Sequence, residues 1–185
     1  MHELLLHTFK AIEHELIRYC VLRDGERMQE FARGGEIDLL VPETHFEQLA
    51  VLLSRLDYKK LSAWGHTPHH FFITYHKASD SWIKLDIVTR VTYGNPIHTL
   101  HTSLADNCIQ HRRRLGLVFV PSVEDEFMTL LLHCVLDKGY IAQHRGARLK
   151  ELSHRVNDDA YFSLLLSQYW VPDSNWPQLS SLVDA

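Results

Sequence analysis

Apolar residues near the start of the chain recur at intervals of three and four positions. This spacing extends from about residue 3 to residue 18 and predicts an amphipathic helix. A short apolar run, YCVL, follows and predicts a strand. The next segment, RDGERMQEFARGG, is polar and contains three glycines, which is typical of a loop with a helical turn. The apolar face of the predicted helix is formed by Leu4, Leu5, Phe9, Ile12, Leu16 and Ile17.

Alternation then replaces the helical spacing. The segment EIDLLV alternates polar and apolar residues and predicts a strand, whereas PETHFEQLAVLLSRLDY returns to helical spacing. Thr44 and Glu47 have the spacing of a capping box, which indicates the start of that helix. Three further strands are predicted in KKLSAW, HHFFITYH and WIKLDIV, and the connection KASD between the last two suits a hairpin.

The pattern changes again around Pro121. A short apolar strand ends there, Ser122 can cap a helix with Asp125 three residues later, and only helical patterns follow as far as Trp170. We therefore expect an α+β protein with a mixed sheet flanked by helices, followed by a helical C-terminal segment. The predicted boundary divides the chain into residues 1–120 and residues 121–185.

Composition narrows the class of protein. The chain has 185 residues, of which 45% are hydrophobic and 23% are charged, so it can bury one substantial core. Its formal net charge of −4 does not favour nucleic acid or an acidic membrane as a partner, and any phosphate site must be local.

The cysteines and the N-terminal segment bear on the compartment. Cys20, Cys108 and Cys134 are odd in number and far apart, which argues against a disulfide framework and against a structural zinc site. The first 20 residues lack the pattern of a signal peptide, and no segment approaches about 20 consecutive apolar residues. We expect a cytoplasmic protein without a membrane span.

Three acidic residues lie on two predicted strands at positions where the alternation of side chains could bring their carboxylates together. In EIDLLV, Glu36 and Asp38 share the face opposite the apolar residues, and Asp86 has the equivalent place in WIKLDIV. If the two strands are neighbours, the three carboxylates meet. Two like charges about 4 Å apart repel by on the order of 4 kcal/mol at an effective dielectric constant of 20. A hard divalent cation such as Mg²⁺ offsets that repulsion, whereas the alternative is a solvated sheet face with Asp86 paired to Lys84 or an arginine.

The order of elements and the placing of these acids carry a resemblance. A helix, a strand, a loop with Gly25, a strand with the acid-x-Asp pair, a helix and a later strand with a third acid resemble the nucleotidyltransferase superfamily of the DNA polymerase beta type. The similarity is greatest to its small bacterial branch, which includes aminoglycoside nucleotidyltransferases and many uncharacterised proteins. It covers residues 17 to 90 by motif and extends more loosely through FVPSVEDEFMTLLLHCVLDKG.

This resemblance implies a magnesium site and a nucleotide site. Glu36 and Asp38 correspond to the ligands of two Mg²⁺ ions, and Asp86 corresponds to the third acid, which helps to activate the attacking hydroxyl. Gly25 corresponds to the turn that holds the phosphates of an NTP. The turn reads LRDGERM, with no serine after the glycine, and the first metal ligand is Glu36 where aspartate is usual.

Several basic side chains could complete the phosphate site. Arg23, Arg27, Arg33 and Lys84 lie near the turn or the acids in sequence, and we favour Arg23 and Lys84. The expected activity is Mg²⁺-dependent transfer of a nucleoside monophosphate from an NTP to a hydroxyl of a sugar, a small molecule or a protein. The alternative is a catalytically inactive binding or regulatory protein with the same fold.

The histidines and one basic run are candidates for other functional sites. His66, His69 and His70 in HTPHH could hold zinc in a metal-dependent hydrolase, but a histidine-rich loop is the favoured interpretation. His133 lies in the apolar run LLLHCVL, which is typical of a hydrogen-bonded core or cleft histidine. The run HRRR at residues 111–114 is interpreted as a solvated helix end.

Overall fold

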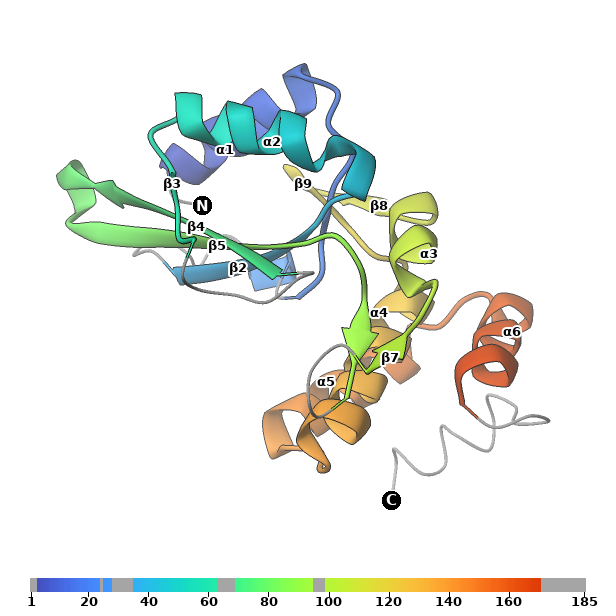
Figure 1. The fold of residues 1–185 in the computed structure, drawn as a ribbon. Helices are drawn as coiled ribbons and strands as arrows, with labels where there is room; N and C mark the ends of the chain where they lie inside the picture. The colour runs from blue at the N-terminus through green and yellow to red at the C-terminus, as the bar shows by residue number, and fades with distance from the viewer. Residues whose placement is uncertain (1–2, 24, 28–34, 63–68, 95–98, 171–185) are drawn as a thin grey trace. The chain divides into compact units, whose positions relative to one another are not determined.

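A computed structural model describes residues 3–23, 25–27, 35–62, 69–94 and 99–170. The chain forms two compact units. Residues 1–91 and 105–121 make up the first, here called the sheet unit, and residues 92–104 and 122–185 make up the second, the helical unit (Figure 1).

The sheet unit is built on five strands in the order β1-β2-β5-β4-β3. β2 and β5 run parallel, and every other neighbouring pair is antiparallel. The expected α+β class with a mixed sheet is thereby confirmed, as is the hairpin between β4 and β5. The strands are β1 (Cys20–Val21), β2 (Gly35–Leu40), β3 (Lys59–Lys60), β4 (His69–His76) and β5 (Ser81–Val88).

Two helices cover one face of this sheet, α1 (Glu3–His14) and α2 (Glu43–Arg55) (Figure 1). Their apolar stripes pack on the inward-facing side chains of β2 and β5 and form the core of the unit. The face of the sheet that carries Glu36, Asp38 and Asp86 is the opposite one, here called the acid face. The core residues at the centre of the contact are Leu5, Phe9, Ile12, Leu49, Leu53, Ile37, Leu39, Ile83, Leu85 and Ile87.

The sequence-based prediction for the end of α1 is wrong. The helix stops at His14 and not at residue 18, because Leu16 adopts a left-handed conformation with φ of 56°. The amide of Ile17 then donates to the carbonyl of Ile12, and that of Leu16 donates to Glu13, which satisfies the last carbonyls of the helix. Leu16 is consequently 82% exposed and does not belong to the apolar face.

The predicted capping box of α2 is also wrong. The helix begins at Glu43, one residue before Thr44, and its N-cap is Pro42, whose side chain cannot accept a hydrogen bond. The φ of −53° at Pro42 is compatible with a helix start, and no side-chain hydrogen bond caps the helix. The helix ends in the same way as α1, with Asp57 at φ of 62° and the amide of Tyr58 donating to Leu53.

The basic run at residues 111–114 is not a solvated helix end. Residues Arg113–Leu115 form strand β8, which pairs with β9 (Val118–Val120) through a turn at Gly116 with φ of 58°. Arg112 and Arg114 lie over the ring of Phe119, and Arg114 also pairs with Glu13 at 2.8 Å. The sequence pattern missed β8, helix α3 (Leu104–Gln110) and the short pair β6 (Thr92–Tyr93) and β7 (Leu100–His101).

The helical unit contains α4 (Val123–Leu132), a π-helix at His133–Lys138, α5 (Gln143–Ser153) and α6 (Asp159–Tyr169). The prediction of helices only between Pro121 and Trp170 is confirmed. Ser122 caps α4 as expected, since its side chain accepts from the amide of Asp125. Three consecutive acids follow the cap and are buried, which requires partners for each of them.

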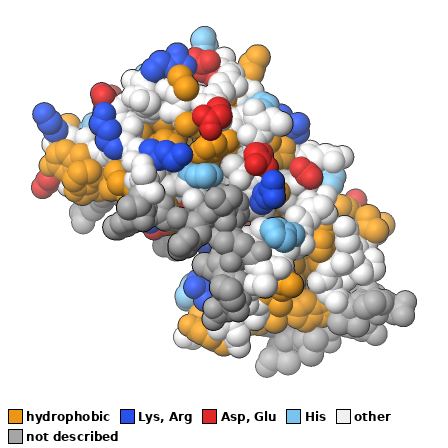
Figure 2. Space-filling model, in the orientation of Figure 1, with side chains coloured by type: hydrophobic (Ala, Val, Ile, Leu, Met, Phe, Trp, Pro, Cys, Tyr) orange, Lys and Arg blue, Asp and Glu red, His pale blue; other side chains and the backbone are white. Residues whose placement is uncertain are grey.

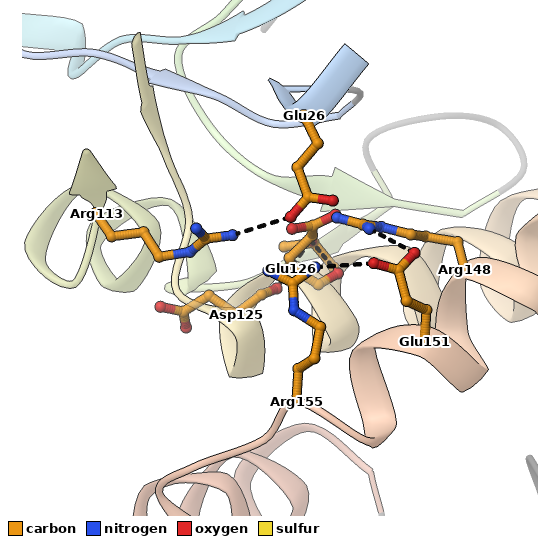
Figure 3. A network of polar contacts seen from close by, with 8 residues as sticks. Glu26, Arg113, Asp125, Glu126, Arg148, Glu151 and Arg155 are labelled. Atoms are coloured by element: carbon orange, nitrogen blue, oxygen red, sulfur yellow. Dashed lines mark hydrogen bonds and ion pairs between the residues drawn. The ribbon is translucent and has the colours of Figure 1, made fainter. Parts of the chain in front are cut away.

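Figure 3 shows how two of these acids and their neighbours are arranged within the helical unit. Glu126 pairs with Arg148 of α5 at 2.6 Å, and Arg148 also reaches Glu151 at 2.8 Å. The fully buried Asp125 accepts a hydrogen bond from the hydroxyl of Tyr161 at 2.7 Å. Acidic side chains of α4 therefore fix the positions of α5 and α6.

Two further properties concern the surface and the thiols. In the space-filling view, acidic and basic side chains are interspersed on the visible face (Figure 2). Cys20, Cys108 and Cys134 are buried, and none of the three forms a disulfide within the described part of the chain. Within the described part of the chain, no helix has both the length and the apolar character needed to cross a membrane.

Candidate functional site

The pairing of β2 with β5 brings the three acids of the acid face together. Asp38 lies directly opposite Asp86, and Glu36 lies opposite Lys84, in parallel register. One carboxylate oxygen from each of Glu36, Asp38 and Asp86 lies within 4.8 Å of those of the other two. Among the described residues, these three form the one group of acids, histidines and cysteines close enough to hold a metal ion.

Each of the three carboxylates has a basic partner. Arg23 Nη1 lies 3.1 Å from Asp38 Oδ2, and Lys84 Nζ lies 3.1 Å from Glu36 Oε1. The residues that we expected to hold phosphate therefore contact the predicted metal ligands. Arg23 follows the end of β1, and Lys84 lies two residues before Asp86 on β5.

The third partner is His69 on β4. Its Nδ1 lies 3.0 Å from both carboxylate oxygens of Asp86. Phe71, not His69, is opposite Asp86 in the antiparallel register, so His69 reaches Asp86 diagonally across the strand pair. Asp86 is the most buried of the three acids, with 7% of its surface exposed.

Burial and neighbouring charge both act on Asp38. Loss of solvent raises the pKa of its carboxyl above the ordinary value, and the charges of Asp86 and Glu36 raise it further. Arg23 and His69 oppose this rise without cancelling it. The site thus disfavours the negative charge that it contains, which is the electrostatic condition that a bound cation relieves.

An aromatic ring helps to place Lys84. Its Nζ lies 4.1 Å from the centre of the Phe71 ring, and Phe71 comes from the same face of β4 as His69. The ammonium group is therefore held between this ring and Glu36. Trp82 and Tyr75 pair across the same two strands nearer the hairpin, with ring centres 5.0 Å apart.

Gly25 opens a short 3₁₀ helix, Gly25–Arg27, after β1. A methyl group at this position would lie 2.3 Å from Val120 Cγ1, so the absence of a side chain allows β9 to pack against the turn. Glu26 of the turn pairs with Arg113 of β8 at 3.6 Å, as Figure 3 also shows. Asp24 and Arg33, and the side chain of Arg27, lie outside the described part of the structure.

The histidines that suggested zinc are separated. His69 and His70 point to opposite faces of β4, and the ring of His70 packs against Phe46 of α2 with ring centres 4.2 Å apart. Burial and the nearby charge of Lys60 lower the pKa of His70. His66 lies outside the described residues. His133 is buried in the helical unit and contacts Asp137 at 2.7 Å, in agreement with the expected hydrogen-bonded histidine.

Comparisons with known proteins give one informative match. Neither a protein-family model nor a curated protein matches the sequence. The structure is similar to the solution structure of the antibiotic-resistance factor ANT(2'')-Ia, an aminoglycoside nucleotidyltransferase, with a TM-score of 0.53. The chain has a nucleotidyltransferase-type fold. The match has 10% sequence identity and covers 97% of this chain and 94% of the other.

Glu36, Asp38 and Asp86 lie on the sheet of a nucleotidyltransferase-type fold. At 10% identity the likeness establishes the architecture alone, and the chemistry must be argued from the side chains of this chain. Substrate-regulated conformation dynamics are described for ANT(2'')-Ia.

Proposed function

We propose that the protein transfers a nucleoside monophosphate from an NTP to a hydroxyl acceptor in a Mg²⁺-dependent reaction. The observation that carries this proposal is the meeting of Glu36, Asp38 and Asp86 on adjacent parallel strands within a nucleotidyltransferase-type fold. Residues 1–120 would form the catalytic domain and residues 121–185 the helical segment that follows it. The acceptor is a sugar, another small molecule or a protein side chain.

The donor set fits magnesium. All three candidate ligands are carboxylates, the hard oxygen donors that Mg²⁺ prefers, and neither a thiol nor an imidazole belongs to the cluster. Glu36 and Asp38 would be the principal ligands of two ions, with Asp86 as the third. When bound, such ions neutralise charge on the phosphates and align the attacking and leaving oxygens.

Asp86 is assigned the transfer of a proton. Its carboxylate would accept the proton of the acceptor hydroxyl while that oxygen attacks the α-phosphorus, and the bond to the β-phosphate would break with release of pyrophosphate. Its burial keeps the carboxylate in one position relative to Glu36 and Asp38.

Arg23 and Lys84 are assigned to the phosphates. Both now neutralise carboxylates of the cluster, at 3.1 Å in each case. Cations bound to Glu36 and Asp38 would compete for the same oxygens and free both basic groups to pair with the triphosphate. The backbone of the turn at Gly25 would supply amide donors beside them.

A specific observation favours the second candidate function. Every acid of the cluster already has a basic partner, so the charge of the acids is balanced without a cation, as a catalytically inactive binding or regulatory protein would require. Thermal unfolding distinguishes the two. Stabilisation by NTP only in the presence of Mg²⁺ supports the enzyme, and no response to any NTP supports the inactive protein.

The proposed activity is tested with Asp38→Asn. NTPs labelled at the α-phosphate are incubated with Mg²⁺ and a panel of hydroxyl acceptors, and labelled product and pyrophosphate are measured. The wild type should transfer label and Asp38→Asn should not, although it remains folded. Asp80→Asn is the matched control. Asp80 lies in the β4–β5 connection, and asparagine keeps the Oδ1 atom that accepts a hydrogen bond from the hydroxyl of Tyr75. Transfer by Asp38→Asn at the wild-type rate would refute the assignment.

A further inference from the structure

We infer that His69 is a positioning residue that fixes the carboxylate of Asp86 for metal binding. The inference rests on the proposed function, because it assigns a role to a side chain that supports one of the proposed ligands. His69 is not itself part of the acidic cluster. Its contact with Asp86 distinguishes it from the other basic residues of the site.

The geometry of that contact is symmetrical. Nδ1 of His69 lies 3.0 Å from Oδ1 and 3.0 Å from Oδ2 of Asp86. A single ring nitrogen in contact with both oxygens restricts the rotation of the carboxylate about its last bond. A carboxylate has about four lone-pair positions, so each oxygen keeps capacity for another partner. The contact therefore orients Asp86 without using up its ability to bind a cation.

The chemistry of the pair determines the direction of the hydrogen bond. An ionised carboxylate only accepts hydrogen bonds, so Nδ1 of His69 must carry the proton and donate it. This is the arrangement by which hydrogen-bonding partners support carboxylates that ligate metals. Arg23 and Lys84 act differently, since each reaches one oxygen through a long side chain and is assigned to phosphate.

Strand pairing explains why His69 can hold a fixed position. Its backbone belongs to β4, whose full length pairs with β5, and its ring is next to that of Phe71 with centres 6.4 Å apart. Its side chain is 31% exposed, whereas that of Asp86 is 10% exposed. His69 thus closes the side of Asp86 that faces β4, while Asp38 lies on the side that faces β2.

Substitutions at position 69 separate positioning from general support of the fold. Asn places its amide nitrogen close to the position of Nδ1 and keeps the donor there. Gln places the amide one methylene further along the side chain and so displaces it, and Leu removes it. His70→Leu is the matched control, because His70 is the next residue on the same strand and packs against Phe46 on the other face.

Mn²⁺ affinity is the readout, measured by electron paramagnetic resonance on the full chain without nucleotide. Circular dichroism verifies that each variant is folded. His69→Gln and His69→Leu should weaken Mn²⁺ binding by about 10- to 100-fold, the usual effect of removing a partner of a metal ligand. His69→Asn and His70→Leu should remain within a few-fold of the wild type. If His69→Leu does not fold, the Mn²⁺ affinities of His69→Asn and His69→Gln are sufficient to test the positioning role.

The outcomes separate this inference from the proposed function. Unchanged Mn²⁺ binding in His69→Gln would overturn the positioning role, and tighter binding would overturn it and show that His69 competes with the cation. Failure of the wild type to bind Mn²⁺ would overturn both proposals. Wild-type Mn²⁺ binding that depends on His69, without nucleotide transfer to any acceptor, would retain the positioning role and reject the activity.

Discussion

The surroundings of Asp38 disfavour the negative charge of its carboxylate. Its pKa is raised because burial removes solvent and because Asp86 and Glu36 are close. A carboxyl group with a raised pKa in the folded state contributes stability below its unfolded pKa, and this contribution is lost as the pH rises through the folded value. At neutral pH the charge of Asp38 is therefore a cost to folding.

Asp38→Asn should for this reason raise the melting temperature of the metal-free protein at pH 7. The amide removes the disfavoured charge and keeps nearly the same shape. A gain of 1 kcal/mol corresponds to a rise of roughly 2–4 °C for a chain of this size. Differential scanning calorimetry in EDTA measures the change. A lower melting temperature would mean that the ion pair with Arg23 outweighs the burial of the carboxylate.

The sequence identified the acids at this scale but not the role of His69. Alternation along a strand determines which residues share a face, so Glu36, Asp38 and Asp86 could be grouped from the sequence. The contact of His69 with Asp86 depends on the register of β4 against β5, which places the two residues diagonally. Strand alternation separates His69 from His70 but says nothing of register, and register was the missing information.

The 3₁₀ helix at Gly25 packs against strand β9. Gly25 faces Val120, and a β-branched side chain has little freedom to move away from an added methyl group. This packing explains the glycine structurally, and the contact of Gly25 with phosphate stays a prediction.

A double-mutant cycle tests both the packing of Gly25 against Val120 and the contact of Gly25 with phosphate. Gly25→Ala should destabilise the protein by about 1–3 kcal/mol through overpacking. The same change should cost less in a Val120→Ala background, where the clash is absent. Urea unfolding gives the free energies, and an equal cost in both backgrounds would contradict the packing argument. Loss of NTP binding in the folded double variant, but not in Val120→Ala alone, would indicate a role of Gly25 at the phosphates.

Helix α1 is tied to the chain that follows α2 by a buried hydrogen bond. The hydroxyls of Thr8 and Tyr58 lie 3.0 Å apart, and burial raises the pKa of Tyr58 to about 12 from an ordinary value of 10.0. A raised pKa means that the neutral phenol supports the fold. That contribution is present below pH 10 and is lost as the pH rises to about 12.

Tyr58→Phe should therefore make the free energy of unfolding less dependent on pH above pH 10. Between pH 10 and 12 the wild type should lose on the order of 2 kcal/mol more than the variant, which has no phenol to ionise. Below pH 9 the variant should be slightly less stable, because Thr8 loses a partner. Urea unfolding across this range measures both effects. Parallel profiles for the two proteins would contradict the assignment.

The element boundaries show what the sequence pattern omits. The periodicity of α1 continues through Leu16 and Ile17, but the left-handed conformation of Leu16 ends the helix by backbone hydrogen bonds that carry no sequence signature at a leucine. Short strands such as β8 contain too few residues for alternation to be recognised. The long elements, α2, β4 and β5, were correctly predicted because their patterns are longer.

At the scale of the whole molecule, the helical unit relies on polar contacts that the sequence did not reveal. Arg148 of α5 joins the buried Glu126 to Glu151, and Arg155 contacts Glu151 at a more exposed position (Figure 3). Arg148 donates two hydrogen bonds to Oε1 of the buried Glu126, from Nε at 2.9 Å and from Nη2 at 2.6 Å, so its removal takes both from a buried carboxylate.

Arg148→Gln should therefore reduce the free energy of unfolding by about 3 kcal/mol, a cost typical of breaking a buried ion pair. Arg155→Gln is the matched control and should cost about 1 kcal/mol or less. Both values are obtained from urea unfolding. Equal effects of the two substitutions would show that the burial of Glu126 does not determine the energetics of the network.

The central claim, that the acid face binds magnesium and an NTP together, is tested most directly by a crystal structure with Mg²⁺ and a non-hydrolysable NTP. The account predicts Mg²⁺ about 2.0–2.1 Å from oxygens of Glu36 and Asp38. It also predicts phosphates in contact with Arg23 and Lys84. A nucleotide bound elsewhere, or Glu36 and Asp38 still paired with Lys84 and Arg23 in the presence of both ligands, would contradict it.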